Sequence, residues 1–313
     1  MPKESSEEET SFDLGGILKN QVLSLRFGYL LIIEWLFDED EKTGLALYQW
    51  LSERLPEGKV KYVKCHSPKD LAESLGEAQR DVSLKGPPIV HFEAHGEEPL
   101  PGDIPAGFIG PDGLGGSALV TWEHLGDVLR PLNIESRLNL LVVGAACYGE
   151  GLLLSAHPGQ PIPFVAAIGY TSTVSVMSLK FSLLELYRGL LIDKKELGLA
   201  VEAANLDLFN PEEVELRLTS MVTQWAESFI EGIGPAIEKI RTHIPHGAAD
   251  QLKDSSSVEK SALPSDAMRR LRWGLVATWE QIWMFSDFPE SEQRFAIDFD
   301  RLIDLAVEHV DRI

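Results

Sequence analysis

The sequence has few cysteines, a shortage of basic residues and no long apolar run. Cys65 and Cys147 are its only cysteines. Two cysteines are too few for a disulfide framework, so a reducing compartment is expected. Lys and Arg number 28 against 49 Asp and Glu, which gives a formal net charge of −21. Phosphate backbones and anionic lipid headgroups repel such a chain, so neither nucleic acid nor a membrane is expected as its main partner.

No apolar segment approaches the roughly 20 residues that a membrane helix needs. The longest, 29–37, is interrupted by Glu34. The first ten residues, MPKESSEEET, are acidic and polar, unlike a signal peptide or a mitochondrial presequence. The hydrophobic fraction of 44% is enough to bury a sizeable core. We therefore expect a folded, soluble, cytoplasmic protein.

Short apolar runs alternate with helical periodicity from residue 23 to residue 209. This alternation predicts an α/β fold with a mostly parallel sheet and helices on both faces. The strand at 138–143 is apolar throughout, which favours a central position. The expected strands are 29–33, 60–63, 88–94, 138–143 and 163–168, and the expected helices are 38–55, 68–80, 121–128, 178–191 and 196–208.

Three regions follow from these patterns. Residues 1–22 form an acidic flexible segment, residues 23–209 form the α/β domain, and residues 210–313 form an all-helical extension. A serine-containing stretch without apolar periodicity, 250–266, is typical of a linker within that extension. Trp273, Trp279 and Trp283 are spaced as they would be in the core of a helical packing.

Two of the expected strands end in residues that carry chemistry. The strand at 88–94 is followed by His95-Gly96, and the strand at 138–143 is followed by GAACYG, which contains Cys147. Active sites in open parallel sheets lie beyond the carboxyl ends of the strands. There the imidazole can activate the thiol as a nucleophile and later protonate a leaving amine. The backbone N–H groups of Gly96 and Cys147 are candidate donors to an oxyanion.

At this point the sequence resembles the caspase-like cysteine peptidases, and within them the bacterial CHAT group. IVHFEAHG and LLVVGAACYG carry the resemblance, with His95 and Cys147 about fifty residues apart. The downstream segments AAIGYTSTVSVMSLKFSLLELYRGLL and GLAVEAAN are also similar to that group. The resemblance implies a caspase-like sheet, His95 as general base and acid, Cys147 as nucleophile, and Gly96 with the Cys147 amide as oxyanion hole.

The same resemblance implies a thiol protease, that is, a cysteine endopeptidase that cleaves a partner protein through an acyl-enzyme, without a cofactor or a metal. It suggests a role in a regulated bacterial defence or cell-death pathway, such as antiviral defence. The C-terminal helices are then a candidate docking region for a regulatory protein. One departure concerns specificity. Relatives often carry Asp or Gln two residues before the cysteine, where this chain has Ala145, so their P1 preference does not transfer.

Two alternatives compete with the peptidase hypothesis. A caspase-like module that has lost catalysis would only bind or scaffold. An α/β-hydrolase would use residues 145–149 as a nucleophile elbow, with its histidine at His243 or His246.

Three other patterns do not support a site. His91 and Glu93 match the H-x-E of zinc deaminases, but the P-C-x-x-C that must follow is absent. Cys65 and His66 are adjacent on a strand, so their side chains point to opposite faces. The acidic run 38–41 lacks a calcium-loop pattern and is interpreted as the solvated start of a helix.

Overall fold

The structure is a computed structural model that describes residues 25–97, 106–156, 160–209, 276 and 279–295. Almost all of these residues belong to one compact unit, Val22–Glu213 with Ala277–Arg294. The acidic segment 1–22, the linker 250–266 and most of the expected extension 210–313 lie outside the described residues, as does Trp273.

A six-stranded sheet forms the centre of this unit, in the order β2-β1-β3-β7-β8-β9. Every neighbouring pair is parallel except β8 and β9. The predicted α/β class with a mostly parallel sheet is therefore confirmed, and β7 lies at its centre as expected. The strands are β1 (Tyr29–Glu34), β2 (Val60–Lys64), β3 (Pro88–Glu93), β7 (Leu141–Ala145), β8 (Ala166–Gly169) and β9 (Asp207–Phe209).

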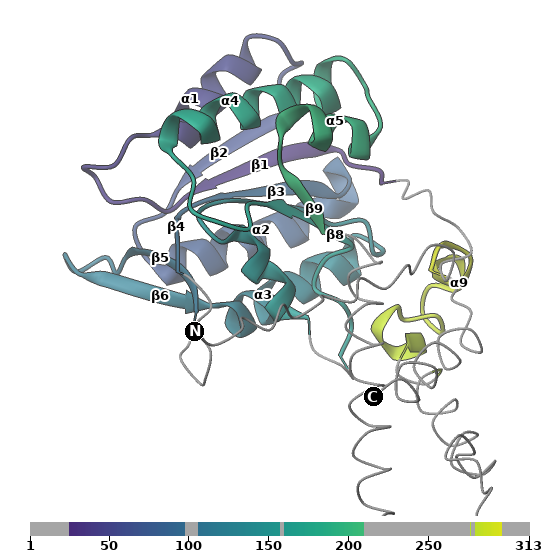
Figure 1. Ribbon diagram of the computed structural model, residues 1–313. Helices are drawn as coiled ribbons and strands as arrows, with labels where there is room; N and C mark the ends of the chain where they lie inside the picture. Colours follow the sequence, from purple (N-terminus) through teal and green to yellow (C-terminus); the bar gives the residue numbers. More distant parts are fainter. Residues whose placement is uncertain (1–24, 98–105, 157–159, 210–275, 277–278, 296–313) are drawn as a thin grey trace, which may run out of the picture. The chain divides into compact units, whose positions relative to one another are not determined.

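Helices cover both faces of the sheet, as the right-handed crossovers of parallel strands require (Figure 1). One face carries α1 (Thr43–Ser52), α4 (Val176–Tyr187) and α5 (Leu197–Ala204), with the π-helical turn η2 (Arg188–Ile192) between the last two. The other face carries α2 (Pro68–Lys85) and α3 (Trp122–Glu135).

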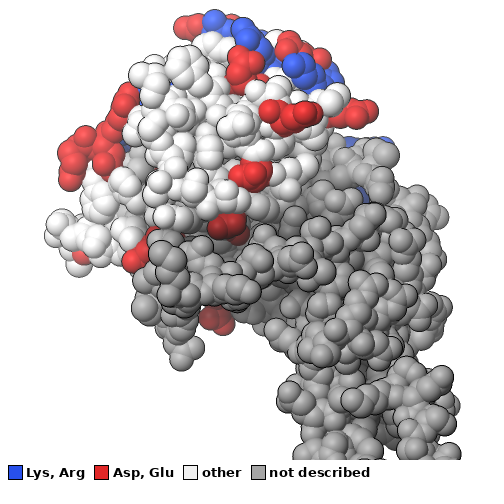
Figure 2. Space-filling view, viewed as in Figure 1, with Lys and Arg blue, Asp and Glu red and all other residues white. Residues whose placement is uncertain are grey.

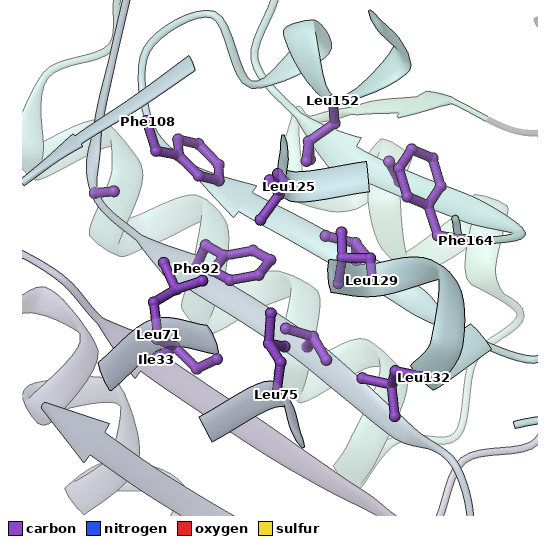
Figure 3. Packing of buried hydrophobic residues seen from close by; sticks show 14 of the residues in the cluster. Ile33, Leu71, Leu75, Phe92, Phe108, Leu125, Leu129, Leu132, Leu152 and Phe164 are labelled. Carbon is purple, nitrogen blue, oxygen red and sulfur yellow. The ribbon is translucent and has the colours of Figure 1, made fainter. Parts of the chain in front are cut away.

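The core has two layers because each central strand is buried on both faces. In β1, Leu31 and Ile33 pack in one layer, and Leu30 and Ile32 pack in the other. Figure 3 shows the layer under α2 and α3, where Phe92 of β3 lies among leucines from both helices. Alternate residues of β1 therefore face opposite layers, as the pleat of a strand dictates.

Several element ends differ from the predictions. The helix expected from residue 38 begins only at Thr43, and residues 38–42 form a loop. The helix expected to reach residue 208 stops at Ala204, because Asn205 adopts a left-handed conformation (φ 53°) that ends it. The chain then forms β9, which the sequence analysis missed.

A small antiparallel sheet follows β3. It consists of β4 (His95–Gly96), β5 (Gly107–Pro111) and β6 (Ser117–Thr121), in the order β4-β5-β6. Strands β5 and β6 form a β-hairpin in this glycine-rich part of the chain. Because β4 begins two residues after β3 ends, this sheet adjoins the carboxyl edge of the main sheet (Figure 1).

Residues 279–294 belong to the same compact unit as the α/β domain. Ile162 N–H donates to the Ile282 carbonyl (3.0 Å), and the Arg294 guanidinium donates to the Leu138 carbonyl (2.9 Å). Trp279 and Trp283 are both buried. The last described helix is α9 (Pro289–Arg294). Among the described residues, the helices are too short or too polar to span a membrane.

Candidate active site

The register of the sheet brings His95-Gly96 and Cys147 to one edge. β3 and β7 are direct neighbours, with Glu93 opposite Ala145 at their carboxyl ends. His95 and Cys147 each come two residues after that last pair. A Cβ atom built on Gly96 would lie only 1.7 Å from the Cys147 carbonyl oxygen. The backbone of Gly96 is therefore in contact with the backbone of Cys147, across 51 residues of chain.

Cys147 lies in the turn between β7 and the 3-10 helix η1 (Gly149–Ser155). Its side chain is partly exposed, and its Sγ atom accepts a hydrogen bond from Val174 N–H (3.5 Å). The next residue, Tyr148, has a positive φ of 54°, which a bulky residue adopts only when its surroundings hold it there. The Tyr148 N–H donates to the Ser172 carbonyl (3.2 Å). The turn that presents the thiol is thus fixed by the segment 172–174.

His95 is the more accessible partner, with 49% of its side chain exposed. Its Nε2 atom lies 2.8 Å from Oδ2 of Asp40, which comes from the β1–α1 loop. The Phe37 ring lies 5.9 Å from the imidazole, centroid to centroid. In this structure the imidazole and the Cys147 thiol do not hydrogen-bond to each other; within the described residues each is engaged by another group.

Two backbone N–H groups at this edge are available as donors. Glu97 N–H bonds the Gly107 carbonyl (3.1 Å), and His95 pairs with Ile109. Hydrogen-bonded and non-hydrogen-bonded pairs alternate along an antiparallel ladder. Since Glu97 is bonded to β5, its neighbour Gly96 belongs to a non-hydrogen-bonded pair, and the N–H of Gly96 points away from β5. The Cys147 N–H makes no hydrogen bond within the part of the chain that the structure describes. These are the two amides expected to form an oxyanion hole.

A buried polar network lies in the main sheet, next to the candidate site. His91 and Glu93 of β3 are almost fully buried. The His91 ring forms two hydrogen bonds, one between Nδ1 and the Tyr187 hydroxyl (2.8 Å) and one between Nε2 and the Glu93 carboxylate (3.0 Å). The Thr43 hydroxyl donates a hydrogen bond to the other carboxylate oxygen of Glu93. Burial and the nearby Glu93 raise the pKa of Tyr187 well above its usual value. Tyr187 therefore keeps its proton. Because the Glu93 carboxylate accepts from Nε2–H of His91, Nδ1 of the neutral ring is an acceptor, and the Tyr187 hydroxyl donates a hydrogen bond to it.

Glu34, the residue opposite Glu93 on β1, holds the start of α1. Its carboxylate accepts from Leu45 N–H (3.1 Å) and from the Tyr62 hydroxyl (2.9 Å). A Cβ atom on Gly44 would lie 2.9 Å from Cγ of Glu93 and 3.2 Å from Oε2 of Glu34, so it would press against both acidic side chains. Helix α1 therefore begins beside these two buried acids. This explains why it starts at Thr43 and not at residue 38.

Tyr187→Phe is expected to destabilise the fold by about 1–3 kcal/mol. The change leaves Nδ1 of buried His91 without its donor, and a buried polar atom without a partner costs this much. Tyr48→Phe is the matched control, because the Tyr48 hydroxyl makes no hydrogen bond within the described residues; its effect should stay within about 0.5 kcal/mol. Urea denaturation of both variants measures the difference. Equal stability of the two variants would contradict the network.

The two thiols are expected to differ in reactivity. Cys65 is fully buried, and burial raises the pKa of its thiol to about 11. Since the thiolate is the reactive form, the native protein should take up one equivalent of iodoacetamide at pH 8, at Cys147, and a second only in denaturant. Mass spectrometry of the alkylated peptides locates the label. A native Cys147→Ser variant that still takes up one equivalent would refute this assignment.

Sequence reasoning missed Asp40, which it placed in a solvated helix start.

Ala145 is buried, so the position two residues before the cysteine carries no polar group. His243 and His246, which the α/β-hydrolase alternative requires, lie outside the described residues. Among the described residues, no three His, Cys, Asp or Glu side chains are grouped so that they would hold a metal ion.

Comparison with known proteins gives little further information. The chain matches no protein-family model, and no curated protein is significantly similar to it. Among solved structures it is similar to a secreted C11 cysteine protease from Bacteroides thetaiotaomicron, in complex with an irreversible peptide inhibitor. The two share 12% sequence identity with a TM-score of 0.36, over 57% of this chain and 58% of that chain. A likeness this weak carries no argument about the site.

Proposed function

We propose that this protein is a cysteine endopeptidase whose dyad is His95 and Cys147. The observation that carries the proposal is the backbone contact at the sheet edge, where Gly96 leaves no room for a side chain beside the Cys147 carbonyl. The proposal is supported by a partly exposed thiol and a half-exposed imidazole that follow the adjacent strands β7 and β3. Acyl transfer needs both of these residue types at one edge of the sheet.

The mechanism follows from the groups at this edge. The Cys147 proton moves to His95, and the thiolate attacks the peptide carbonyl carbon. The N–H groups of Gly96 and Cys147 stabilise the resulting oxyanion. The imidazolium then protonates the leaving amine, which leaves an acyl-enzyme on Cys147. A water molecule, deprotonated by His95, hydrolyses the thioester and restores the thiol.

A peptide acyloxymethyl-ketone probe tests this proposal. The wild-type chain should form a thioether with the probe at Cys147, and Cys147→Ala should form none. Cys65→Ala is the matched control, because it removes the buried thiol and should label like the wild type. Profiling of new N-termini in a bacterial lysate, with active protein against Cys147→Ala, then identifies the cleaved protein. Equal labelling of the wild type and Cys147→Ala would refute the proposal.

The second candidate is a caspase-like module that binds without cleaving. The observation that favours it is the engagement of His95 by Asp40 and of the Cys147 sulfur by Val174, with no bond between the two. A peptide ligand would then bind at the same edge without being cut. The absence of labelling with any peptide probe, together with tight binding of a protein partner that stays intact, would favour this candidate.

The resemblance to the CHAT group supports a regulated bacterial defence or cell-death pathway as the setting. In that setting residues 23–209 form the peptidase domain, and the C-terminal extension 210–313 receives a regulatory protein. Part of the extension, residues 279–294, lies in the same unit as the α/β domain. A partner that binds the full chain and fails to bind a chain ending at residue 209 would support this role for the extension.

A further inference from the structure

The β1–α1 loop brings one carboxylate to the ring of His95. Asp40 Oδ2 lies 2.8 Å from His95 Nε2, although the two residues are 55 positions apart in the chain. The loop belongs to an acid-rich segment, residues 38–41, that projects at the left edge of the described unit (Figures 1 and 2). Only Asp40 of these acids contacts the dyad.

The Asp40 side chain is held in place before it meets the ring. The same oxygen, Oδ2, accepts the N–H of Phe37 (2.8 Å), and the Asp40 N–H donates to the Phe37 carbonyl (3.1 Å). Lys180 of α4 forms an ion pair with Glu41, the next residue. The loop is therefore held by hydrogen bonds within itself and by an ion pair to α4, so the position of Asp40 is fixed.

Proton placement on the ring follows from this contact. A carboxylate only accepts hydrogen bonds, so a bond to Asp40 requires the proton on Nε2 of His95. In the neutral ring the lone pair is then on Nδ1. The other tautomer would point its lone pair on Nε2 at the carboxylate and would carry its proton on Nδ1, so Nδ1 could not accept a proton from the thiol. Asp40 thus selects which ring nitrogen can act as a base.

We propose that Asp40 is a positioning residue for the dyad, a role that rests on the proposed peptidase function. It holds the His95 ring by Nε2–H, so that Nδ1 receives the proton of Cys147 and later gives it to the leaving amine. It also stabilises the imidazolium formed in between, because the carboxylate lies beside the positive charge. The carboxylate itself gives up and takes up no proton.

Asp40→Asn tests the proposal, with Asp38→Asn as the matched control. Both changes remove one negative charge from the same loop, but Asp38 pairs with Lys64 (2.6 Å) and does not contact the dyad. For Asp40→Asn we expect kcat for a peptide substrate to fall roughly 10- to 100-fold with KM changed less than about twofold. Asp38→Asn should behave like the wild type. Asp40→Glu, which keeps the charge, should recover part of the loss.

Histidine NMR of the full chain tests the contact without relying on activity. With ¹⁵N-labelled histidine, and His95→Ala for assignment, the wild type and Asp38→Asn should show His95 protonated on Nε2. Asp40→Asn should show a mixture of tautomers. Thermal melting should be similar in all three, since a half-exposed contact between polar side chains contributes little to stability.

Two results would overturn the proposal: kinetics of Asp40→Asn that match Asp38→Asn, or an unchanged His95 tautomer in Asp40→Asn. The failure of the peptidase assignment looks different. A wild-type chain that never reacts at Cys147 would overturn the proposed function and with it the positioning role, while the NMR signal would still report whether Asp40 holds the ring.

Discussion

Replacement of His95 by alanine is expected to lower peptidase turnover about 1000-fold. The imidazole supplies both proton transfers of the proposed reaction, and general acid–base groups typically contribute on the order of 10²–10⁴ in rate. Steady-state hydrolysis of a peptide that labels at Cys147 measures the effect. The fold should be little affected, because His95 is half exposed and outside both layers of the core.

His124→Ala is the control for this experiment. His124 is an exposed histidine on α3, and its loss should leave turnover unchanged. A His95→Ala protein that keeps wild-type activity would refute the dyad and would direct attention to the α/β-hydrolase alternative, in which another histidine serves Cys147.

Gly96→Ala is expected to abolish activity and to destabilise the fold by about 3 kcal/mol. The added methyl group would lie 1.7 Å from the Cys147 carbonyl oxygen and 2.9 Å from its carbon, so one of the two backbones must move. Overpacking of a filled site costs on the order of 1–3 kcal/mol or more. Because the backbone that moves carries both the dyad and the oxyanion donors, catalysis should fall by more than the stability loss accounts for.

Gly198→Ala gives the matched comparison. Gly198 lies in α5, and a Cβ atom there would contact nothing within 4 Å. Alanine is the better helix former by about 0.5–1 kcal/mol, so this variant should be as stable as the wild type or slightly more stable. Urea denaturation measures the stability of each variant, and activity assays at low urea measure its catalysis separately. Wild-type activity in Gly96→Ala would show that the strand ends are not in contact.

The fold was predictable because its strands are short apolar runs separated by clear turns. Leu141–Ala145 and Pro88–Glu93 are buried on both faces, which is the pattern of central parallel strands. Once these strands are neighbours, the residues that follow them meet at one edge. The expected meeting of His95-Gly96 with Cys147 therefore depended only on strand order.

The remaining features depend on contacts that a linear pattern does not contain. Asp40 lies in a run of acids, and nothing in that run indicates which acid turns toward the dyad. The helix after it begins late because Glu34 and Glu93 bind its start from two strands of the sheet. β9 has only three residues, too few for an alternation of polarity to be recognised.

A disulfide test measures most directly whether His95 and Cys147 lie together. Gly96, the residue after His95, is in backbone contact with Cys147, and a disulfide joins residues whose Cα atoms are about 4.4–6.8 Å apart. In a Cys65→Ser background, His95→Cys should form a disulfide with Cys147 under mild oxidation, detected by mass spectrometry of the linked peptides. Glu97→Cys, two residues further along and bonded into the ladder with β5, should not. Two free thiols in the oxidised His95→Cys protein would contradict the dyad and the peptidase built on it.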